Sequence, residues 1–252
     1  MKEKFRKVPT STHHLSIPFT PFFLLTANLI ILPTPTAIAI PKYRALYASV
    51  HADPTFCQMG FGHHFLARKW SDEETKDVIL SRDVGRSWKE RGMGDFAVGR
   101  WEGVVGDVGD VGRILGGEEI RIVEGDEYNV LVGTDGRLFD AVHWIGYVGV
   151  RDATTTSMPE RAPADPELPP WLEMVELRYG VAPECWGRGV ARGAAEAVMQ
   201  WAVSERGAKR FIAETERDNV RSGRVLEKLG FRLSGTNYWK EPSEVEWERC
   251  PR

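Results

Sequence analysis

The amino-acid sequence predicts one layered α/β domain, and three observations support this prediction. A length of 252 residues suits one sizeable domain or one domain with long loops. Hydrophobic residues make up 42% of the chain and charged residues 27%, which is typical of a soluble globular protein. From Trp171 onward, strand patterns alternate with segments of helical periodicity, and this is the element order of an α/β fold.

The N-terminal region combines a basic leader with an apolar segment. Met1–Pro21 is predicted to be a flexible tail. Prolines and threonines interrupt Phe22–Ile40, which therefore lacks the roughly 20 uninterrupted apolar residues of a membrane-spanning helix. We expect a strand around Leu25–Leu32 in this segment. A signal peptide is the alternative, because Lys2–Lys7 is basic and Ala37–Ala39 is small.

Two helices and two strands are predicted next. Pro41–Val50 is expected to open a helix, because proline fits the first helical turn. Ser71 and Glu74 have the spacing of a capping box, which predicts that a helix over Asp72–Arg91 begins here. Strands are predicted at Asp95–Trp101 and Val142–Val150.

The segment 102–140 is predicted to be an insertion between these two strands. Its part Val105–Gly112 reads V-G-D-V-G-D-V-G, a biased repeat that is typical of a loop. Tyr128–Val132 and Thr134–Gly136 are expected to pair as a small hairpin. Because such a repeat cannot easily fill a core, we expect that replacement of Val104–Gly125 by a short Gly/Ser link leaves folding and CoA binding largely intact.

The C-terminal part carries the clearest alternation of elements. We predict the following order: strand Glu173–Val181, helix Gly187–Glu205, strand Lys209–Thr215, helix Val220–Leu229, strand Phe231–Trp239 and edge strand Val245–Arg249.

A glycine-rich turn joins the first of these strands to the first helix. Gly187 and Gly189 remove side chains where a ligand can approach the backbone. The free N–H groups and the positive dipole end of the following helix would then form a cradle for a pyrophosphate. Arg188 and Arg192 add positive charge at the same place. An ordinary tight turn is the alternative, since neither a complete Rossmann fingerprint nor a Walker sequence is present.

Two motifs in this region resemble those of GNAT N-acetyltransferases. Pro183–Arg192 is similar to the acetyl-CoA loop, a Gln/Arg-x-x-Gly-x-Gly/Ala signature, with Trp186 as in the Tyr-Trp-Gly-x-Gly form of the RimJ/RimL-like branch. Asn219–Phe231 resembles Asn-x-x-Ser-x-Arg-Val-Leu-Glu-Lys-Leu-Gly-Phe of the same branch. The close resemblance covers Glu173–Leu233, and both motifs occur in the family's order.

The resemblance implies a GNAT fold, with a mixed, mostly antiparallel central sheet that splays near Tyr179–Ala182 and is flanked by helices. It also implies transfer of acetyl from acetyl-CoA to an amine of a protein N-terminus or a small molecule. The residues implied to bind acetyl-CoA are Val181, Trp186, Gly187, Arg188, Gly189, Val190, Ala191, Asn219 and Ser222.

The residues for the chemistry are less sharply defined. Glu176 is the candidate base that takes the proton of the amine, with a structural ion pair to Arg178 as the alternative. Leu226 occupies the position where the superfamily usually has a tyrosine that protonates the thiolate. Ser222 is therefore the candidate hydrogen-bond donor to the sulfur, and Tyr179 is a reserve candidate.

The acceptor is expected to approach from the side opposite acetyl-CoA. Thr154–Pro170 is predicted to be a loop, and its carboxylates Glu160, Asp165 and Glu167 would attract a cationic amine. The acceptor itself and the oligomeric state stay open. Two further residues are considered for the acceptor side: His63 and His64.

Other classes of site and partner are not expected. Cys57, Cys185 and Cys250 form no zinc-binding pattern, so we expect no metal and reduced thiols in a cytoplasmic protein. A net charge of −3 gives no reason to expect nucleic acid as a partner, and no membrane partner is expected. A catalytically weak, CoA-binding regulatory protein and a transferase of longer acyl groups are the functional alternatives.

Overall fold

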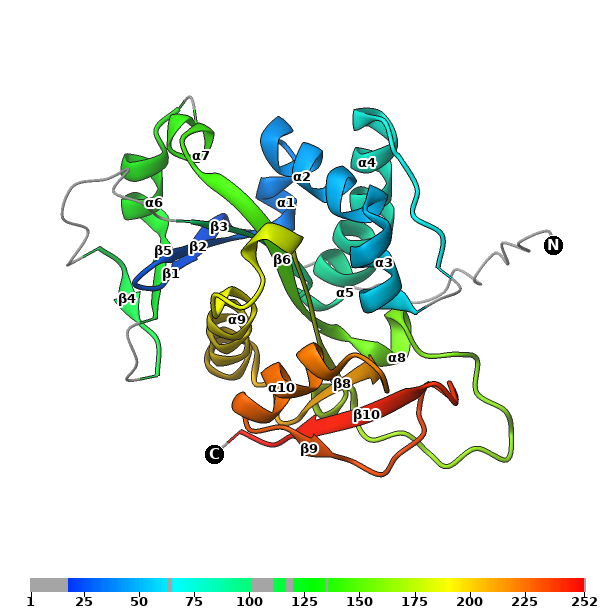
Figure 1. The fold of residues 1–252 in the computed structure, drawn as a ribbon. Coiled ribbons are helices and arrows are strands. Elements are labelled where there is room, and N and C mark those ends of the chain that lie inside the picture. Colours follow the sequence, from blue (N-terminus) through cyan, green and yellow to red (C-terminus); the bar gives the residue numbers. More distant parts are fainter. Residues whose placement is uncertain (1–17, 63–64, 101–110, 117–119, 135, 252) are drawn as a thin grey trace.

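The computed structural model describes residues 18–62, 65–100, 111–116, 120–134 and 136–251. In these ranges one sheet has the strand order β4-β5-β1-β2-β3-β6-β7-β8-β10-β9, and all neighbours are antiparallel except β7 and β8 (Figure 1). The strands are β1 Phe22–Leu25, β2 Leu29–Pro33, β3 Asp95–Arg100, β4 Arg113–Ile114, β5 Arg121–Glu124, β6 His143–Asp152, β7 Val175–Val181, β8 Phe211–Glu216, β9 Arg232–Leu233 and β10 Glu244–Arg249.

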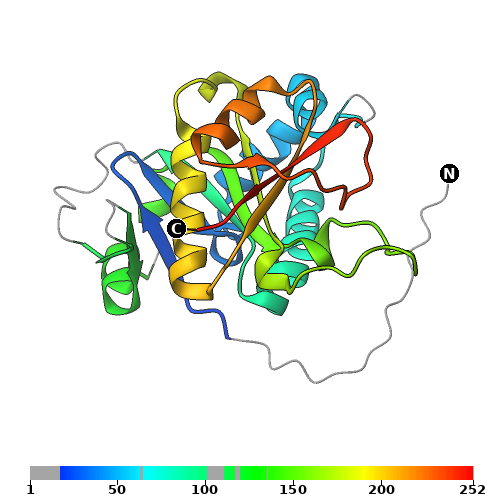
Figure 2. The same ribbon diagram turned by 90° about the horizontal axis from the view of Figure 1, so that it is seen from below.

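Helices cover both faces of this sheet. Helix α9 lies across one face, and α1 to α5 lie on the opposite face (Figures 1 and 2). The helical elements are α1 Thr34–Ala37, α2 Pro41–Ala52, α3 Pro54–Phe61, α4 Asp72–Ile79, the π-helix η1 Leu80–Trp88, α5 Lys89–Arg91, α6 Gly125–Val132, α7 Arg137–Asp140, α8 Ala153–Thr156, the 3₁₀-helices η2 Trp171–Glu173 and η3 Pro183–Cys185, α9 Val190–Arg206 and α10 Val220–Lys228.

The N-terminal apolar segment forms a hairpin and not the single strand that was expected over Leu25–Leu32. The turn between β1 and β2 is fixed by Thr26, whose hydroxyl accepts a hydrogen bond from the Leu29 amide at 3.0 Å. Every residue of β1 and β2 is buried, because both faces of the hairpin are covered. Residues 1–17, which include most of the predicted flexible tail, lie outside the described residues.

The helix predicted over Asp72–Arg91 is present, but its middle is a π-helix. The capping box is confirmed, since the Ser71 hydroxyl accepts from the Glu74 amide at 3.1 Å and the Glu74 carboxylate accepts from the Ser71 amide at 2.9 Å. The wider turn of η1 allows two residues five positions apart to reach β3 together. The Asp83 carboxylate accepts a hydrogen bond from the Asp95 amide at 2.9 Å, and the Trp88 indole donates one to the Asp95 carbonyl at 3.0 Å.

The C-terminal end differs from the prediction in two respects. The strand expected over Phe231–Trp239 is limited to β9, because Glu246 fixes the residues after β9 as a loop. Its carboxylate accepts from the Thr236 hydroxyl at 2.6 Å and from the Trp239 amide at 2.9 Å. Strand β10 was expected at the edge, but it lies between β8 and β9.

The segment predicted as an insertion contributes to the sheet and the core. Strand β5 pairs with β1 and extends the sheet on that side, where α6 and α7 also lie (Figure 1). The hairpin expected at Tyr128–Gly136 is wrong, because the residues before Gly133 form α6. Leu115, Ile120 and Ile122 are buried, so this part has a core role. Most of the glycine–valine–aspartate repeat, up to Asp110, lies outside the described residues.

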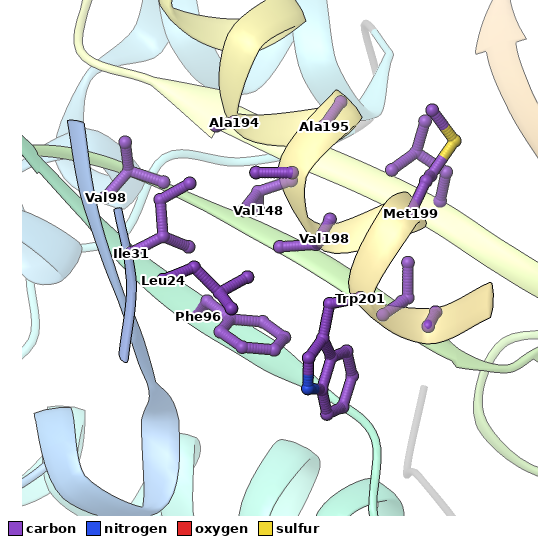
Figure 3. Packing of buried hydrophobic residues seen from close by; sticks show 14 of the residues in the cluster. Leu24, Ile31, Phe96, Val98, Val148, Ala194, Ala195, Val198, Met199 and Trp201 are labelled. Atoms are coloured by element: carbon purple, nitrogen blue, oxygen red, sulfur yellow. The ribbon is translucent and has the colours of Figure 1, made fainter. Parts of the chain in front are cut away.

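Helix α9 is fixed to the sheet by an apolar stripe that ends in Trp201. Figure 3 shows these α9 side chains directed toward the strands. The Trp201 ring is 1% exposed and lies 5.2 Å from the ring of Phe96 and 5.4 Å from that of Phe22, measured between centroids. Burial of such large rings is a major apolar contribution to stability. The contacts hold α9 in place, and thereby the glycine-rich turn before its first residue.

We expect that Ile122→Ala lowers the free energy of unfolding by about 2–5 kcal/mol, as truncations of buried aliphatic side chains do. Ile122 is 2% exposed in β5, whereas Ile114 in neighbouring β4 is 53% exposed. Ile114→Ala is the matched control and should change stability by less than about 0.5 kcal/mol. Urea unfolding followed by circular dichroism measures both. Equal, small effects would mean that this segment is dispensable for the fold.

Candidate functional site

Strands β7 and β8 separate soon after they begin. Their parallel pairing is limited to Val175 with Phe211 and Glu176 with Ile212. Beyond these pairs β7 continues beside β6 as far as Val181, and β8 continues beside β10. The sheet is therefore open along the second half of β7, which includes the predicted position near Tyr179–Ala182. Backbone groups that face this opening have no neighbouring strand and are available to a ligand.

The glycine-rich turn lies at the start of α9. Gly187 and Gly189 have φ values of +75° and +78°, a left-handed conformation that favours glycine. A Cβ atom at either position would meet no atom within 4 Å, so the turn faces open space. Helix α9 has 17 residues, and the N–H groups at its first turn have no partner within the helix. The geometry fits an anion such as a pyrophosphate.

A cavity of about 910 Å³ connects this turn with the opening between the strands. Eight of the nine residues predicted to bind acetyl-CoA line it: Val181, Trp186, Gly187, Gly189, Val190, Ala191, Asn219 and Ser222. Arg188 is the exception: it is exposed and does not line the cavity.

The positive charge of the cavity comes mainly from residues that the sequence analysis missed. Arg192 of α9 was expected, and Arg221, Arg224 and Lys228 of α10 also line the wall. The spacing of these α10 residues, three and seven positions after Arg221, places them on one face of a helix. That spacing was visible in the sequence and predicts a basic wall that suits a ligand with several phosphates.

Trp186 joins the turn to the end of β7. Its indole nitrogen donates to the Val181 carbonyl at 2.6 Å, so one acceptor position of that carbonyl is already used. The guanidinium carbon of Arg221 lies 5.0 Å from the centroid of the Trp186 ring, which is a cation–π contact. Trp186 therefore couples the turn, β7 and α10.

Asn219 and Ser222 lie where the resemblance predicts them, but the Asn219 amide is occupied within the protein. Its oxygen accepts from the Ser222 amide at 3.1 Å and caps α10, and its nitrogen donates to the Met59 carbonyl at 2.6 Å. The Tyr179 hydroxyl donates to the Ser222 carbonyl at 3.3 Å. Burial raises the pKa of Tyr179 to about 12, so this side chain is a neutral phenol at physiological pH.

A second cavity of about 940 Å³ lies on the face that α2, α3 and η1 cover. It shares six lining residues with the first cavity: Gly60, Phe61, Tyr147, Tyr179, Asn219 and Ser222. The two cavities therefore meet beside the opening between β7 and β8. This arrangement provides separate approaches for two substrates.

Glu176 lines the second cavity and is 4% exposed. Its partner is Arg151, directly opposite on β6, which donates two hydrogen bonds at 2.9 and 3.0 Å. The Ser157 hydroxyl also donates to this carboxylate. Burial raises the pKa of Glu176, but the charge and hydrogen bonds of Arg151 and the bond from Ser157 outweigh it and lower the pKa below its ordinary value. The predicted alternative, a pair with Arg178, does not form, because Arg178 contacts Asp95 at 3.6 Å.

The acidic loop predicted at the acceptor side lies away from the cavity. Glu160, Asp165 and Glu167 are absent from its lining. Asp165 is bound by Lys240 at 2.6 Å and by Arg161 at 3.6 Å, and the hydrogen bond from Lys240 is the main cause of its lowered pKa. His63 and His64, the other residues considered for the acceptor side, lie outside the described residues. Carboxylates of β8 and β10, which were not predicted, line the cavity: Glu214, Glu216 and Glu244.

Comparison with known proteins shows which fold this arrangement represents. Residues 122–232 match the model of the acetyltransferase (GNAT) domain. An acetyltransferase from Agrobacterium tumefaciens str. C58 superposes with a TM-score of 0.53 at 19% identity, over 96% of this chain and 100% of that one. The chain has the GNAT fold. A putative GNAT-family acetyltransferase from Bordetella pertussis gives 0.54 at 16% identity, over 90% and 99% of the two chains.

The GNAT fold confirms the predicted fold class. A domain from Methanocaldococcus jannaschii DSM 2661 is also similar, with a TM-score of 0.52 at 15% identity over 88% of this chain and 98% of that one. Within the described ranges, none of the helices has the length and apolar character that a membrane crossing requires. The same ranges contain no group of three His, Cys, Asp or Glu side chains placed to hold a metal.

We expect that Gly189→Glu weakens CoA binding by more than about 100-fold, because a negative side chain would fill the anion cradle. Gly207→Glu is the matched control. Gly207 follows the other end of α9 with a φ of +71° and also faces open space, so it imposes the same backbone strain far from the cradle. Calorimetry with CoA on both folded variants measures the effect. Unchanged affinity in Gly189→Glu would rule out this turn as the phosphate site.

Proposed function

We propose that this protein transfers an acetyl group from acetyl-CoA to the amine of an acceptor. The observation that carries the proposal is the junction of two cavities beside the opening between β7 and β8. The basic cavity with the glycine turn suits CoA, whose pyrophosphate would lie at Gly187–Gly189 and whose thioester would lie near Tyr179 and Ser222. The second cavity would bring the amine to the same junction. Such placement of two reactants is a large source of rate acceleration.

Acetyl transfer needs a neutral amine, although an amine is mostly protonated at neutral pH. We assign proton acceptance to Glu176, which lines the acceptor cavity and is kept ionised and oriented by Arg151 and Ser157. Its lowered pKa makes it a weak base, and a short path to the bound amine would compensate for that weakness.

The leaving thiolate needs a hydrogen-bond donor. Leu226 is fully buried where the superfamily usually has a tyrosine, so that position supplies none. Tyr179 and Ser222 line both cavities and are the donors that we assign to the sulfur. A phenol with a pKa of about 12 stabilises a thiolate by donating a hydrogen bond more readily than by giving up its proton.

A CoA-binding protein without turnover is the second candidate function. Two observations favour it: Leu226 replaces the usual acid, and Arg151 occupies both oxygens of Glu176. Acetyl-CoA consumption with a panel of amines, including peptides with free N-termini, separates the two candidates. Turnover with any amine supports the transferase, and tight CoA binding without turnover supports the regulator. The RimJ/RimL-like motifs favour an N-acetyltransferase, and the free cysteines Cys57, Cys185 and Cys250 suit a location in the cytoplasm.

We expect that Glu176→Gln lowers kcat by roughly 10²–10⁴-fold, the usual contribution of a general base, while the affinity for CoA is unchanged. Ser157→Ala is a milder test of the same role. It removes a hydrogen bond to the ionised carboxylate, so the pKa of Glu176 rises and the acid limb of the kcat/KM profile moves to higher pH. Steady-state kinetics across pH measures both effects. An acid limb that stays in place in both variants would mean that Glu176 is not the base.

A further inference from the structure

Strands β8 and β10 present four glutamates on one face of the sheet. Glu216 is directly opposite Glu244, and Glu214 is directly opposite Glu246. Directly opposite residues of an antiparallel pair share a face, and like charges in such pairs are destabilising. A group of this kind in a folded protein requires compensation from hydrogen bonds or positive charge.

The protein itself compensates only part of the repulsion between these glutamates. Glu246 is satisfied by hydrogen bonds from the loop after β9. Glu248, the next acidic residue on β10, is paired with Arg210 and Arg232, each at 3.0 Å. By contrast, no lysine or arginine in the described ranges forms an ion pair with Glu214, Glu216 or Glu244, the three members that line the second cavity.

Among these three glutamates, Glu214 has a buried carboxylate oxygen, Oε2, without a hydrogen-bond partner among the described residues. Burial and the charges of Glu176 and Glu244 raise its pKa to about 9. Burial, followed by the charge of Glu216, raises the pKa of Glu244 to about 7. The unpartnered carboxylate and its geometry indicate a place for a cation at this end of the cavity.

Other side chains of the cavity wall also favour a ligand with N–H donors and positive charge. Asp83 is 6% exposed and Tyr43 is fully buried, and both line this cavity with an oxygen that has no partner in the described part of the chain. Buried polar atoms are usually satisfied, so these oxygens are available to a ligand's N–H groups. Tyr47 and Tyr147 also line the cavity, but their ring faces are already in contact with His51 and Arg178. Apart from the arginines, the polar groups of the wall are therefore carboxylates and hydroxyls.

Four arginines line the cavity, and none of them forms an ion pair with Glu214, Glu216 or Glu244 in the described ranges: Arg82, Arg86, Arg151 and Arg178. Arg151 is held by Glu176, and Arg178 contacts Asp95 and lies with its guanidinium carbon 5.1 Å from the centroid of the Tyr147 ring. Arg82 and Arg86 are exposed, and Arg86 donates to the Thr155 carbonyl at 2.9 Å. The charges of Arg151 and Arg178 are thus balanced before a ligand arrives. A bound molecule with several positive charges would balance the rest.

We propose that the acceptor is a linear aliphatic polyamine with two or more ammonium groups separated by methylene chains. One amino group lies at the junction of the cavities, and a second ammonium is bound by Glu214, Glu216 and Glu244. This inference rests on the proposed acetyl transfer. The wall argues against a peptide N-terminus, because peptide carbonyl oxygens would face carboxylates.

The reaction is balanced without a further reagent. The nitrogen of the polyamine forms a bond to the acetyl carbon as the carbon–sulfur bond of the thioester breaks. One proton of the ammonium passes to the base before attack. A second proton leaves the nitrogen as the amide forms and is taken up by the thiolate to give CoA, while the base returns its proton to solvent. The product is a monoacetylated polyamine that keeps at least one ammonium group.

The test compares 1,4-diaminobutane and spermidine with 1-aminobutane, a monoamine of the same chain length. We expect a kcat/KM preference for the polyamines of about 100-fold or more, because a charge-assisted hydrogen bond contributes about ten- to hundredfold. Glu214→Gln/Glu244→Gln should reduce this preference to less than about tenfold. Glu160→Gln is the control: it makes the same charge change on the exposed loop outside the cavity and should keep the preference.

Binding gives a readout that does not depend on turnover. Because the pKa of Glu214 is about 9 without ligand, binding of an ammonium should release a proton. Calorimetry of spermidine against the CoA complex, in buffers with different ionisation enthalpies, measures this release. Glu214→Gln should reduce this release to the part that Glu244 contributes, and it should weaken binding at least about tenfold.

The outcomes separate this inference from the proposed function. Equal kcat/KM for the monoamine and the polyamines, or spermidine affinity and proton release that Glu214→Gln leaves unchanged, would overturn the polyamine site while leaving acetyl transfer intact. Preferred turnover of a peptide N-terminus would overturn it in the same way. CoA binding without turnover of any amine would overturn the proposed function, and spermidine binding with proton release would still support the cation site.

Discussion

The site depends on one constraint, the end of pairing between β7 and β8 after Glu176 and Ile212. Each strand keeps its other neighbour, so the sheet remains continuous while its centre opens. Backbone groups along the opening lack the partners that buried strands normally have, and a ligand that inserts there can satisfy them. The two cavities meet at this place because it is where the sheet no longer separates its two faces.

The surrounding contacts keep this opening in a fixed shape. On one side, the aromatic cluster around Trp201 anchors α9, and Trp186 connects the turn before α9 to Val181. On the other side, Asn219 connects α10 to the Met59 carbonyl in α3. Because these contacts form within the protein, they would position the cofactor side without using its binding energy. Preorganisation of this kind favours both binding and catalysis.

The acceptor side has a different electrostatic character. Arg151 and Glu176 form a buried pair, and loss of one partner from such a pair typically costs about 3–5 kcal/mol. Glu214, Glu216 and Glu244 have no comparable partner in the described residues, and Glu214 and Glu244 have raised pKa values. A group whose folded-state pKa is raised above its unfolded value favours folding only while it is protonated. Glu214 therefore destabilises the empty protein increasingly as pH rises from the ordinary glutamate range toward 9.

The sequence predicted the features that depend on residues close together in the chain. The glycine turn and the capping box at Ser71 each follow from residues a few positions apart, and the structure contains both. The basic row on α10 was equally local and could have been found from its helical spacing. The general fold followed from alternation together with the family resemblance.

Features that depend on strand register could not be predicted from the sequence. The partner of Glu176 is Arg151, because the β6–β7 register places them opposite each other. The glutamate group exists only because β10 inserts between β8 and β9. The role of β5 follows from its pairing with β1, nearly a hundred positions away in the chain. In each case the contact is set by the topology of the whole sheet.

A crystal structure of the CoA complex would test the central claim most directly. The account predicts that the pyrophosphate contacts the amides at Gly187–Val190, that the pantetheine arm lies between β7 and β8, and that the sulfur lies beside Tyr179 and Ser222, where the second cavity begins. CoA bound elsewhere, or a sulfur that points away from the second cavity, would contradict it.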